Sequence, residues 1–409
     1  MRPNLPVRMK HFLHLWILLT LGLRPVPGNA QDFRTVGYLP TYRFNLIDKV
    51  ELNRLTHLNI AFANPDENGD MTTGEADIGT VVQKAHAAGL DVFIALAGAG
   101  AQLSDWEGRI DSVHRSSFIH KIIEFSLQHD LQGIDVDLEW GNVNDDYSGF
   151  VMELKDSLDR YGMKMTAAFP GAYRYSQVTE KALSVFDWIN VMAYDLTGPW
   201  TPDNPGPHSP YSYAENSISY WAGQGVDKQR LALGVPFYGY DFTDLDNVTA
   251  VTFSEMVNMD TAYAQIDQVG QIYYNGLATI EQKTDLALNE ANGIMIWEIG
   301  QDYFGEFSLL KRIDETIEEY LQGLMVKSEQ TGEVKVFPNP VSDFMYLKLN
   351  TPQNIKIILL SAAQQVLKEQ YCDHQELISI GMGDIPDGIY FLLVEGKDFS
   401  KTFKIVKFK

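Results

Sequence analysis

Cysteine is almost absent from this chain of 409 residues, which has a single one, Cys372. An intrachain disulfide is therefore impossible, so an exported chain of this kind has to be stabilised by a sizeable hydrophobic core. The nine histidines are scattered, and no cluster of cysteine and histidine has the spacing of a metal site. We therefore predict no metal site.

Basic residues are also scarce: 32 lysines and arginines stand against 54 aspartates and glutamates, and the formal net charge is −22. A surface with this excess of negative charge repels phosphate backbones and anionic lipid. The composition therefore argues against binding to nucleic acid or to membrane surfaces. Aromatic residues, in contrast, are plentiful, with seven Trp and 20 Tyr, which leaves room for an aromatic binding surface beyond the core.

A membrane-spanning run is lacking at the N-terminus, where the apolar stretch "FLHLWILLTLGL" (12–23) is shorter than the ~20 residues that cross a bilayer. Basic residues precede this stretch, and the small residues "GNA" (28–30) follow it. This order is typical of a secretory signal peptide, so we predict that residues 1–30 are removed and that the mature chain begins near Gln31. A buried N-terminal helix is the alternative.

From residue 35 onward, short β-like runs alternate with helical ones. Most of the β-like runs are almost continuously apolar, as strands buried on both faces require. Eight such strands with intervening helices fit a (β/α)8 TIM barrel over residues 31–325, and a doubly wound open sheet is the alternative. The expected strands are 35–40, 57–63, 91–97, 133–139, 164–170, 188–194, 230–237 and 293–299, and the expected helices include 77–89, 114–129, 146–161, 277–291 and about 304–321.

One strand carries three acidic residues: in "QGIDVDLEW" (132–140), Asp135, Asp137 and Glu139 alternate with apolar residues. The period of two places the three carboxyl groups on one face, with Cα atoms ~6.6 Å apart. In a parallel barrel, catalytic groups gather where the strands end, so Glu139 should stand at the mouth. Repulsion and burial raise the pKa of at least one carboxyl group, which then holds a proton as a general acid requires. An edge strand with an ordinary polar face is the alternative.

This strand resembles the signature of glycoside hydrolase family 18, the chitinases and endo-β-N-acetylglucosaminidases. Five further stretches resemble other barrel strands of that family in the same order, and together they cover roughly residues 34–320. They are "VGYLPTY" (36–42), "THLNIAFA" (56–63), "MAYD" (192–195), "LGVPFYG" (233–239) and "GIMIWE" (293–298). The resemblance implies the (β/α)8 fold and a glycosidase that needs no metal or organic cofactor.

The resemblance also implies a retaining mechanism that is assisted by the substrate's own 2-acetamido group. Glu139 would protonate the leaving oxygen and later activate water. Asp137 would orient the acetamide N–H and balance the charge of an oxazolinium ion, and Asp135 would assist Asp137. Tyr194 would donate a hydrogen bond to the acetamide oxygen, and Asp195 would bind substrate or adjust Glu139.

Five more residues are candidates for contact with the sugar. Trp297, at the end of the eighth strand, is the expected floor, because apolar sugar faces stack on indole. Trp200 lies on a Gly/Pro-rich loop after the sixth strand, where sugar contacts are expected, and Met192 belongs to the same predicted binding set. Tyr38 and Tyr238 end the first and seventh strands and can reach the site. For each of the aromatic residues, a packing role is the alternative.

Two of the motifs depart from the family's pattern. Gln132 stands where the family usually has Asp, and Ala95 stands where it usually has Ser, with Ala97 at a position that is usually Gly. We expect both changes to affect groups that support Asp135, and thus the rate and the pH optimum more than the type of reaction.

The C-terminal part has a different pattern. A polar linker, 326–333, precedes an all-β module, 334–409, whose short strands suggest a small sandwich. "VFPNPVSDFMYLKL" (336–349) and the basic end of the chain resemble the type A sorting domain of the type IX secretion system. The resemblance implies a Gram-negative cell, export across the outer membrane by the secretion machinery, and removal of the module. The enzyme would be released or held at the cell surface.

A carbohydrate-binding module is the alternative for this C-terminal part. Such a module normally shows a line of exposed aromatic residues. The aromatic residues of the predicted strands instead fit core positions, which favours the sorting domain; they are Phe344, Tyr346, Tyr390 and Phe391.

Together these features predict a secreted chitinase that acts on β-1,4-linked N-acetylglucosamine. The interval between the seventh and eighth strands, about 238–292, is too short for the extra α+β domain that deepens the cleft of many processive chitinases, so we expect an open groove and endo-acting cleavage. An endo-β-N-acetylglucosaminidase that cuts the chitobiose core of N-linked glycans would share the catalytic residues. A non-catalytic chitin- or glycan-binding lectin is the alternative from another class, and Glu139 argues against it.

Overall fold

The computed structural model describes residues 33–98, 104–330, 334–361, 365–397 and 400–408. They form two compact units. The barrel unit runs up to Thr279 and includes Leu286–Phe304, and the C-terminal unit is made of Ile280–Asp285 and Gly305–Lys409. The predicted signal peptide lies outside the described residues. Within the described ranges, no helix has both the length and the apolar character that crossing a bilayer requires.

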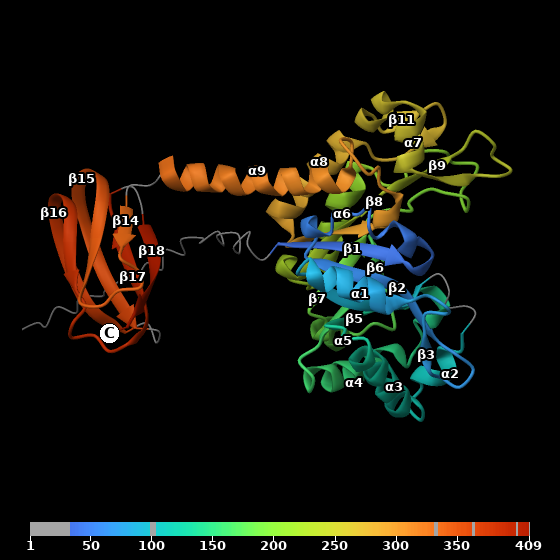
Figure 1. The fold of residues 1–409 in the computed structure, drawn as a ribbon, viewed down its shortest axis with the longest axis horizontal. Coiled ribbons are helices and arrows are strands. Elements are labelled where there is room, and N and C mark those ends of the chain that lie inside the picture. Colours follow the sequence, from blue (N-terminus) through green and yellow to red (C-terminus); the bar gives the residue numbers. More distant parts are fainter. Residues whose placement is uncertain (1–32, 99–103, 331–333, 362–364, 398–399, 409) are drawn as a thin grey trace, which may run out of the picture. The chain divides into compact units, whose positions relative to one another are not determined.

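Eight parallel strands close into a ring in the barrel unit (Figure 1). Each strand pairs with its neighbours in chain order, and β1 pairs with both β2 and β13. A closed ring excludes the open doubly wound sheet and confirms the predicted (β/α)8 fold. The barrel strands are β1 (Arg34–Pro40), β2 (His57–Pro65), β4 (Asp91–Ala97), β5 (Gly133–Asp137), β6 (Lys164–Pro170), β7 (Trp188–Met192), β8 (Leu231–Pro236) and β13 (Gly293–Trp297).

Helices between the strands cover the outside of the ring, and the predicted helices are confirmed. Side-chain caps start several of them, because a short polar side chain accepts one of the free N–H groups of the first turn, as Asp77 does from Thr80 and Thr179 from Ala182. The α-helices are α1 (Ile78–Ala87), α2 (Glu107–Ile110), α3 (Arg115–Gln128), α4 (Tyr147–Asp159), α5 (Glu180–Val185), α6 (Tyr211–Gly223), α7 (Phe253–Met259), α8 (Leu277–Glu290) and α9 (Leu309–Gln330). Short 3-10 helices are η2 (Thr41–Leu46), η3 (Leu52–Arg54), η5 (Trp140–Asn142), η6 (Lys228–Arg230), η7 (Thr261–Gln265) and η8 (Ile299–Gln301).

The interval between β8 and α8 folds into a small antiparallel sheet with the order β10-β9-β12-β11, joined by helix α7. The expectation that this interval is too short for an α+β insertion is therefore wrong. The strands have only two to four residues, too few for a clear period of two in the sequence. Their bounds are β9 (Tyr238–Asp241), β10 (Thr249–Thr252), β11 (Gln268–Val269) and β12 (Ile272–Tyr273), and a further short strand, β3 (Met71–Thr72), pairs with β2.

Helix α9 begins later and ends later than predicted, at Leu309 and Gln330. Residues 326–330 of the predicted linker are therefore helical, and 331–333 lie outside the described residues. The polar stretch that suggested a linker has Lys, Glu and Gln, which are good helix formers, and no proline or glycine before Gln330. Polarity alone therefore does not end a helix.

The C-terminal module is all-β, as predicted. Five antiparallel strands enclose one hydrophobic core: β14 (Val334–Phe337), β15 (Phe344–Ser361), β16 (Val366–Gly381), β17 (Gly388–Glu395) and β18 (Ser400–Lys407). The long strand β15 pairs with β14, β16 and β17. Strand β16 has only a weak signal in the sequence, because it is mostly polar and exposed, without a regular alternation.

The prediction that four aromatic residues of this module are core is wrong for two of them. Tyr390 is buried, but Phe344 and Tyr346 are 56% and 37% exposed. The period of two on β15 places Met345 and Leu347 in the core, so the residues between them point outward. Their exposure removes one argument against a carbohydrate-binding module.

Candidate active site

Three carboxyl groups lie along β5 and just beyond its end. Asp135 and Asp137 are buried within the strand, which ends two residues earlier than predicted. Glu139 follows in an extended conformation, with φ −123° and ψ 155°, and is half-buried. The alternation of the strand therefore continues to Glu139, and the three side chains keep one face.

Asp135 is held by hydrogen bonds from three other barrel strands. Tyr38 Oη donates to its Oδ2 at 2.5 Å, while Thr166 Oγ1 and Asn190 Nδ2 donate to its Oδ1 at 2.5 and 3.0 Å. Burial raises the pKa of Asp135, and the hydrogen bonds from Thr166, Tyr38 and Asn190 act against that rise. Asp135 is thus fixed in place at the floor of the site.

Asp137 is buried, and one of its carboxyl oxygens is unpaired. Among the described residues, its Oδ1 has no hydrogen-bond partner. Leaving a buried polar atom unpaired costs about 1–3 kcal/mol, so this oxygen is ready to accept an N–H or O–H from a ligand. Burial first, and then the carboxyl groups of Glu139 and Asp135, raise the pKa of Asp137 well above its ordinary value.

Glu139 has the proton affinity of a general acid. Burial and, secondly, the negative charge of Asp195 raise the pKa of Glu139 to about 7. A large share of the Glu139 side chains therefore still carries a proton at neutral pH, and the side chain lines a cleft of about 550 Å³ into which it can deliver that proton.

The cleft lies over the carboxyl ends of β5, β6 and β7, the edge at which barrel enzymes carry their chemistry. Loops after these three strands supply its walls, which combine the two acidic groups with exposed aromatic rings. The lining residues are Glu139, Trp140, Pro170, Gly171, Tyr173, Met192, Tyr194, Asp195, Trp200 and Tyr213.

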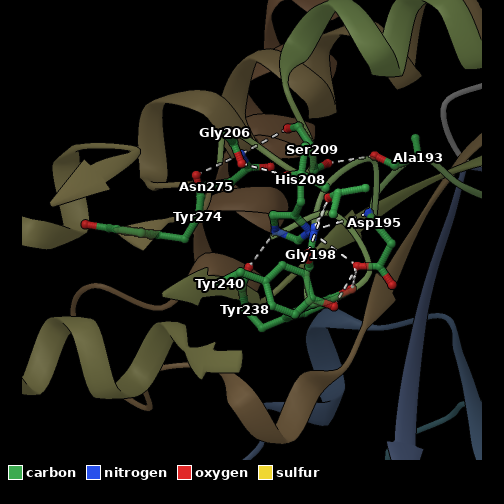
Figure 2. Close-up of polar contacts among 12 residues, drawn as sticks. Ala193, Asp195, Gly198, Gly206, His208, Ser209, Tyr238, Tyr240, Tyr274 and Asn275 are labelled. Atoms are coloured by element: carbon green, nitrogen blue, oxygen red, sulfur yellow. Dashed lines mark hydrogen bonds and ion pairs between the residues drawn. The ribbon is translucent and has the colours of Figure 1, made fainter. Parts of the chain in front are cut away.

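Tyr194 and Asp195 follow β7 directly. Tyr194 is 8% exposed, and its hydroxyl lies 3.8 Å from Met295 Sδ, so the hydroxyl has no strong acceptor at that contact. Asp195 Oδ1 accepts hydrogen bonds from Tyr238 Oη at 2.5 Å and from Tyr240 Oη at 3.1 Å (Figure 2). Both side chains line the cleft together with Glu139.

The predicted sugar contacts divide into two groups. Met192 and Trp200 line the cleft, and the half-buried Trp297 at the end of β13 stacks on Phe62 with ring centroids 5.5 Å apart. Tyr38 and Tyr238 are buried instead, and their hydroxyls hold the carboxyl groups of Asp135 and Asp195.

Sequence reasoning missed several residues of the site. Thr166 and Asn190 had a usable signal, because each is a single polar residue within an otherwise apolar run, "MTAAFP" (165–170) and "WINVMAY" (188–194). The aromatic wall residues Tyr173 and Tyr213 had none, because the position of Tyr173 depends on the course of a loop and that of Tyr213 on where helix α6 begins. Neither did His208, which contacts Asp195 from a loop segment 13 residues further on.

The two departures from the family's pattern have different outcomes. Ala95 lies beside Asp135 in the register of β4 with β5, so a hydroxyl that a serine would supply is absent there. Gln132, which precedes β5, bonds His86 and the backbone of Val92 and Asp130. The expectation that the change at position 132 affects a group that supports Asp135 is therefore wrong, since the partners of Gln132 lie at the end of the strand opposite Glu139.

Comparisons with known proteins agree with this geometry. A family model described as "Glycosyl hydrolases family 18" matches residues 34–302, and one described as "Secretion system C-terminal sorting domain" matches residues 335–408. Among curated proteins, Chitinase A1 of Niallia circulans is 24% identical over 56% of this chain. The chain spans 10%, 63% and 46% of the lengths of three such relatives, which are Probable chitinase 10 of Drosophila melanogaster, a chitinase-like effector of Moniliophthora roreri and Chitinase A1.

Solved structures give more complete matches. The GH18 chitinase ChiB from the chitin utilization locus of Flavobacterium johnsoniae is 42% identical, with a TM-score of 0.69 over 71% of this chain and 95% of that one. A chitinase from Bacteroides thetaiotaomicron is 26% identical, with a TM-score of 0.62 over 70% of this chain and 97% of that one. The chain therefore belongs to glycosyl hydrolases family 18, and it carries a C-terminal sorting domain of a secretion system.

Proposed function

We propose that this protein is a chitinase that hydrolyses β-1,4-linked N-acetylglucosamine with retention of configuration and with assistance from the substrate's acetamido group. The observation that carries the proposal is the buried Oδ1 of Asp137, which has no partner among the described residues and lies on the same face as the protonated Glu139. Assistance by the acetamido group requires an unpaired acceptor for the acetamide N–H, here Asp137 Oδ1, close to a proton donor, here Glu139.

In the first step, Glu139 donates its proton to the glycosidic oxygen as the bond to the anomeric carbon breaks. The carbonyl oxygen of the 2-acetamido group attacks that carbon and forms an oxazolinium ion. Asp137 accepts the acetamide N–H and balances the positive charge, and the hydroxyl of Tyr194 donates to the acetamide oxygen. In the second step, water attacks the anomeric carbon while Glu139 takes its proton, which opens the ring and restores the acid.

Asp135 assists by stabilising Asp137 in the two steps. Its hydrogen bonds from Tyr38, Thr166 and Asn190 keep it in place, and its charge raises the pKa of Asp137. Asp137 and Asp135 can therefore share one proton in the free enzyme, and Asp137 can carry a negative charge when the oxazolinium ion forms.

We propose that the enzyme cleaves bonds within the polysaccharide rather than at its ends, because the cleft is open at the rim. Its lining residues lie between Glu139 and Tyr213, and none of these belongs to the insertion at β9–β12. Trp140, Tyr173 and Trp200, each at least half exposed, offer flat rings on which sugars beyond the cleavage site can stack. An endo-β-N-acetylglucosaminidase with the same carboxyl groups, or a glycan-binding lectin, would also use this surface.

The pH dependence follows from Glu139. We expect kcat/KM to fall as the pH rises through about 7, the pKa to which burial and Asp195 raise this group, because deprotonated Glu139 cannot protonate the leaving oxygen. Initial rates on a chito-oligosaccharide across neutral pH test this. Activity that stays constant well above that pH would exclude Glu139 as the acid.

The sorting domain supports export to the outside of the cell or to its surface. We propose the sequence of segments as a signal peptide, 1–30, a catalytic barrel, 31–325, and a sorting module, 334–409. The predicted linker between the last two, 326–333, begins within helix α9, which ends at Gln330. The secretion machinery would recognise the module and remove it, while the barrel acts on chitin or on other glycans that contain N-acetylglucosamine.

The identity of the substrate is tested by incubating the full chain with a chitin hexasaccharide and, separately, with a high-mannose glycoprotein. The masses of the products are then measured by mass spectrometry. Internal cleavage of the hexasaccharide supports the chitinase. Glycans released with one N-acetylglucosamine left on the protein would move the assignment to the deglycosylating enzymes. If both substrates stay intact but bind, the lectin is the correct reading.

A further inference from the structure

His208 lies directly behind Asp195, outside the set of groups that the reaction uses. It is 1% exposed and belongs to the loop between β7 and α6. Hydrogen bonds fasten this loop segment to the chain around Asp195: Leu196 N donates to His208 O at 2.9 Å, and Ser209 Oγ donates to Ala193 O at 2.6 Å (Figure 2). The imidazole is therefore held in one position.

The two ring nitrogens of His208 have different partners. Nε2 lies 3.1 Å from Tyr238 O, and because a carbonyl oxygen only accepts, Nε2 must carry a hydrogen. Nδ1 lies 3.4 Å from both the backbone N and the Oδ1 of Asp195. A neutral ring accepts from the Asp195 N–H through Nδ1, and a protonated ring donates to the carboxylate, so Asp195 is a partner in either state.

Asp195 needs such support. Its φ of 63° is in the left-handed region, which residues other than glycine seldom adopt. Among the described residues, Tyr238, Tyr240 and His208 all reach the same oxygen, Oδ1. The carboxylate is thus fixed by one oxygen, while its side chain remains 40% exposed and lines the cleft beside Glu139.

We propose that His208 is a positioning residue that holds the Asp195 carboxylate beside the general acid Glu139 and thereby sets the pH range in which Glu139 keeps its proton. The inference rests on the proposed role of Glu139. It extends that role, because part of the electrostatic environment of Glu139 then depends on His208. Among the described contacts, His208 touches neither Glu139 nor the cleft.

Other titratable groups face Glu139 and Asp195 from neighbouring elements. Burial raises the pKa of the facing tyrosines, so these phenols stay neutral; they are Tyr175 and Tyr194 beside Glu139 and Tyr238 and Tyr240 beside His208. Among the described residues, the charges of Asp137 from β5 and of Asp195 from the loop after β7 interact with Glu139. Moving Asp195 away therefore lowers the pKa of Glu139 from about 7.

The test compares the pH profile of kcat/KM in the full chain and in two variants. His208→Leu removes all hydrogen bonds that the imidazole makes. We expect the alkaline limb of the pH profile to move to lower pH by about one unit. His208→Asn keeps a polar atom near the position of Nδ1 and should restore part of the shift. Asp195→Asn should shift the limb in the same direction, and adding His208→Leu to it should give no further shift, because the histidine acts through Asp195.

A second measurement does not depend on turnover. The carboxyl carbon of Glu139 is labelled with ¹³C, and its NMR signal is identified as the one that Glu139→Gln lacks. This signal should titrate at lower pH in the His208 variants that retain a cooperative thermal transition. An unchanged titration and an unchanged limb in a folded variant, or additive shifts in the double variant, would overturn the proposal. If the wild-type chain cleaves no glycan, the proposed function fails, and the titration still decides the role of His208.

Discussion

Replacing Glu139 by Gln is expected to reduce kcat on chitin oligosaccharides by roughly 10²–10⁴-fold, the usual contribution of a positioned general acid. The amide has nearly the same shape but no proton of suitable acidity to give to the leaving oxygen. Because Glu139 is half-buried and lines the cleft, the substitution leaves the walls intact, and the oligosaccharide should still bind. Steady-state kinetics and calorimetric titration with a hexasaccharide measure the two properties.

The matched control is Glu124→Gln on α3, an exposed position paired with His120. It removes the same charge at a residue that does not line the cleft, and it should leave kcat unchanged. A Glu139→Gln variant that retains more than about a tenth of the wild-type kcat would contradict the assignment of the acid. Loss of binding together with a lowered melting temperature would show instead that Glu139 is needed for the fold.

Replacing Asp137 by Asn is expected to lower kcat by about 10²–10³-fold, as the loss of a preorganised group that stabilises transition-state charge does. The carboxylate is needed in its charged form when the oxazolinium appears, and an amide cannot balance that charge. The fold should survive, because the substitution relieves a buried group whose pKa is raised by burial and by two neighbouring carboxyl groups.

The substrate offers an independent check on the same step. With partially deacetylated chitin, each new reducing end should carry an acetyl group, because the sugar that is attacked must supply its own acetamide. Product masses after selective labelling of the reducing ends report this directly. Asp156→Asn, an exposed position on α4, serves as the control for loss of an aspartate. New reducing ends that lack the acetyl group would contradict assistance by the substrate.

Much of the barrel could be predicted from the sequence because buried parallel strands have a strong signature. The eight apolar runs, each between loops, correspond to the eight barrel strands within a few residues. The acidic strand had a second signal, since three carboxyl groups at a spacing of two are rare on a buried strand. Glu139, Asp137 and Asp135 therefore emerged together, before any neighbouring strand was placed.

The remaining parts depend on contacts that no local pattern encodes. His208 reaches Asp195 only because the loop after β7 folds back on itself. The strands of the β9–β12 insertion are too short to show a period, and the outward face of β15 was misassigned because both of its faces carry large apolar residues. Tertiary packing decides such cases, and it is set by elements far apart in the chain.

The most direct test of the central claim is the configuration of the product at the moment of cleavage. Proton NMR of a chitin hexasaccharide in the first minutes of hydrolysis distinguishes the β-anomer from the α-anomer before they equilibrate. Two displacements at the anomeric carbon, by the acetamido oxygen and then by water, predict that the β-anomer appears first. If the α-anomer appears first, water attacks directly, and the roles proposed for Asp137 and the acetamido group are wrong.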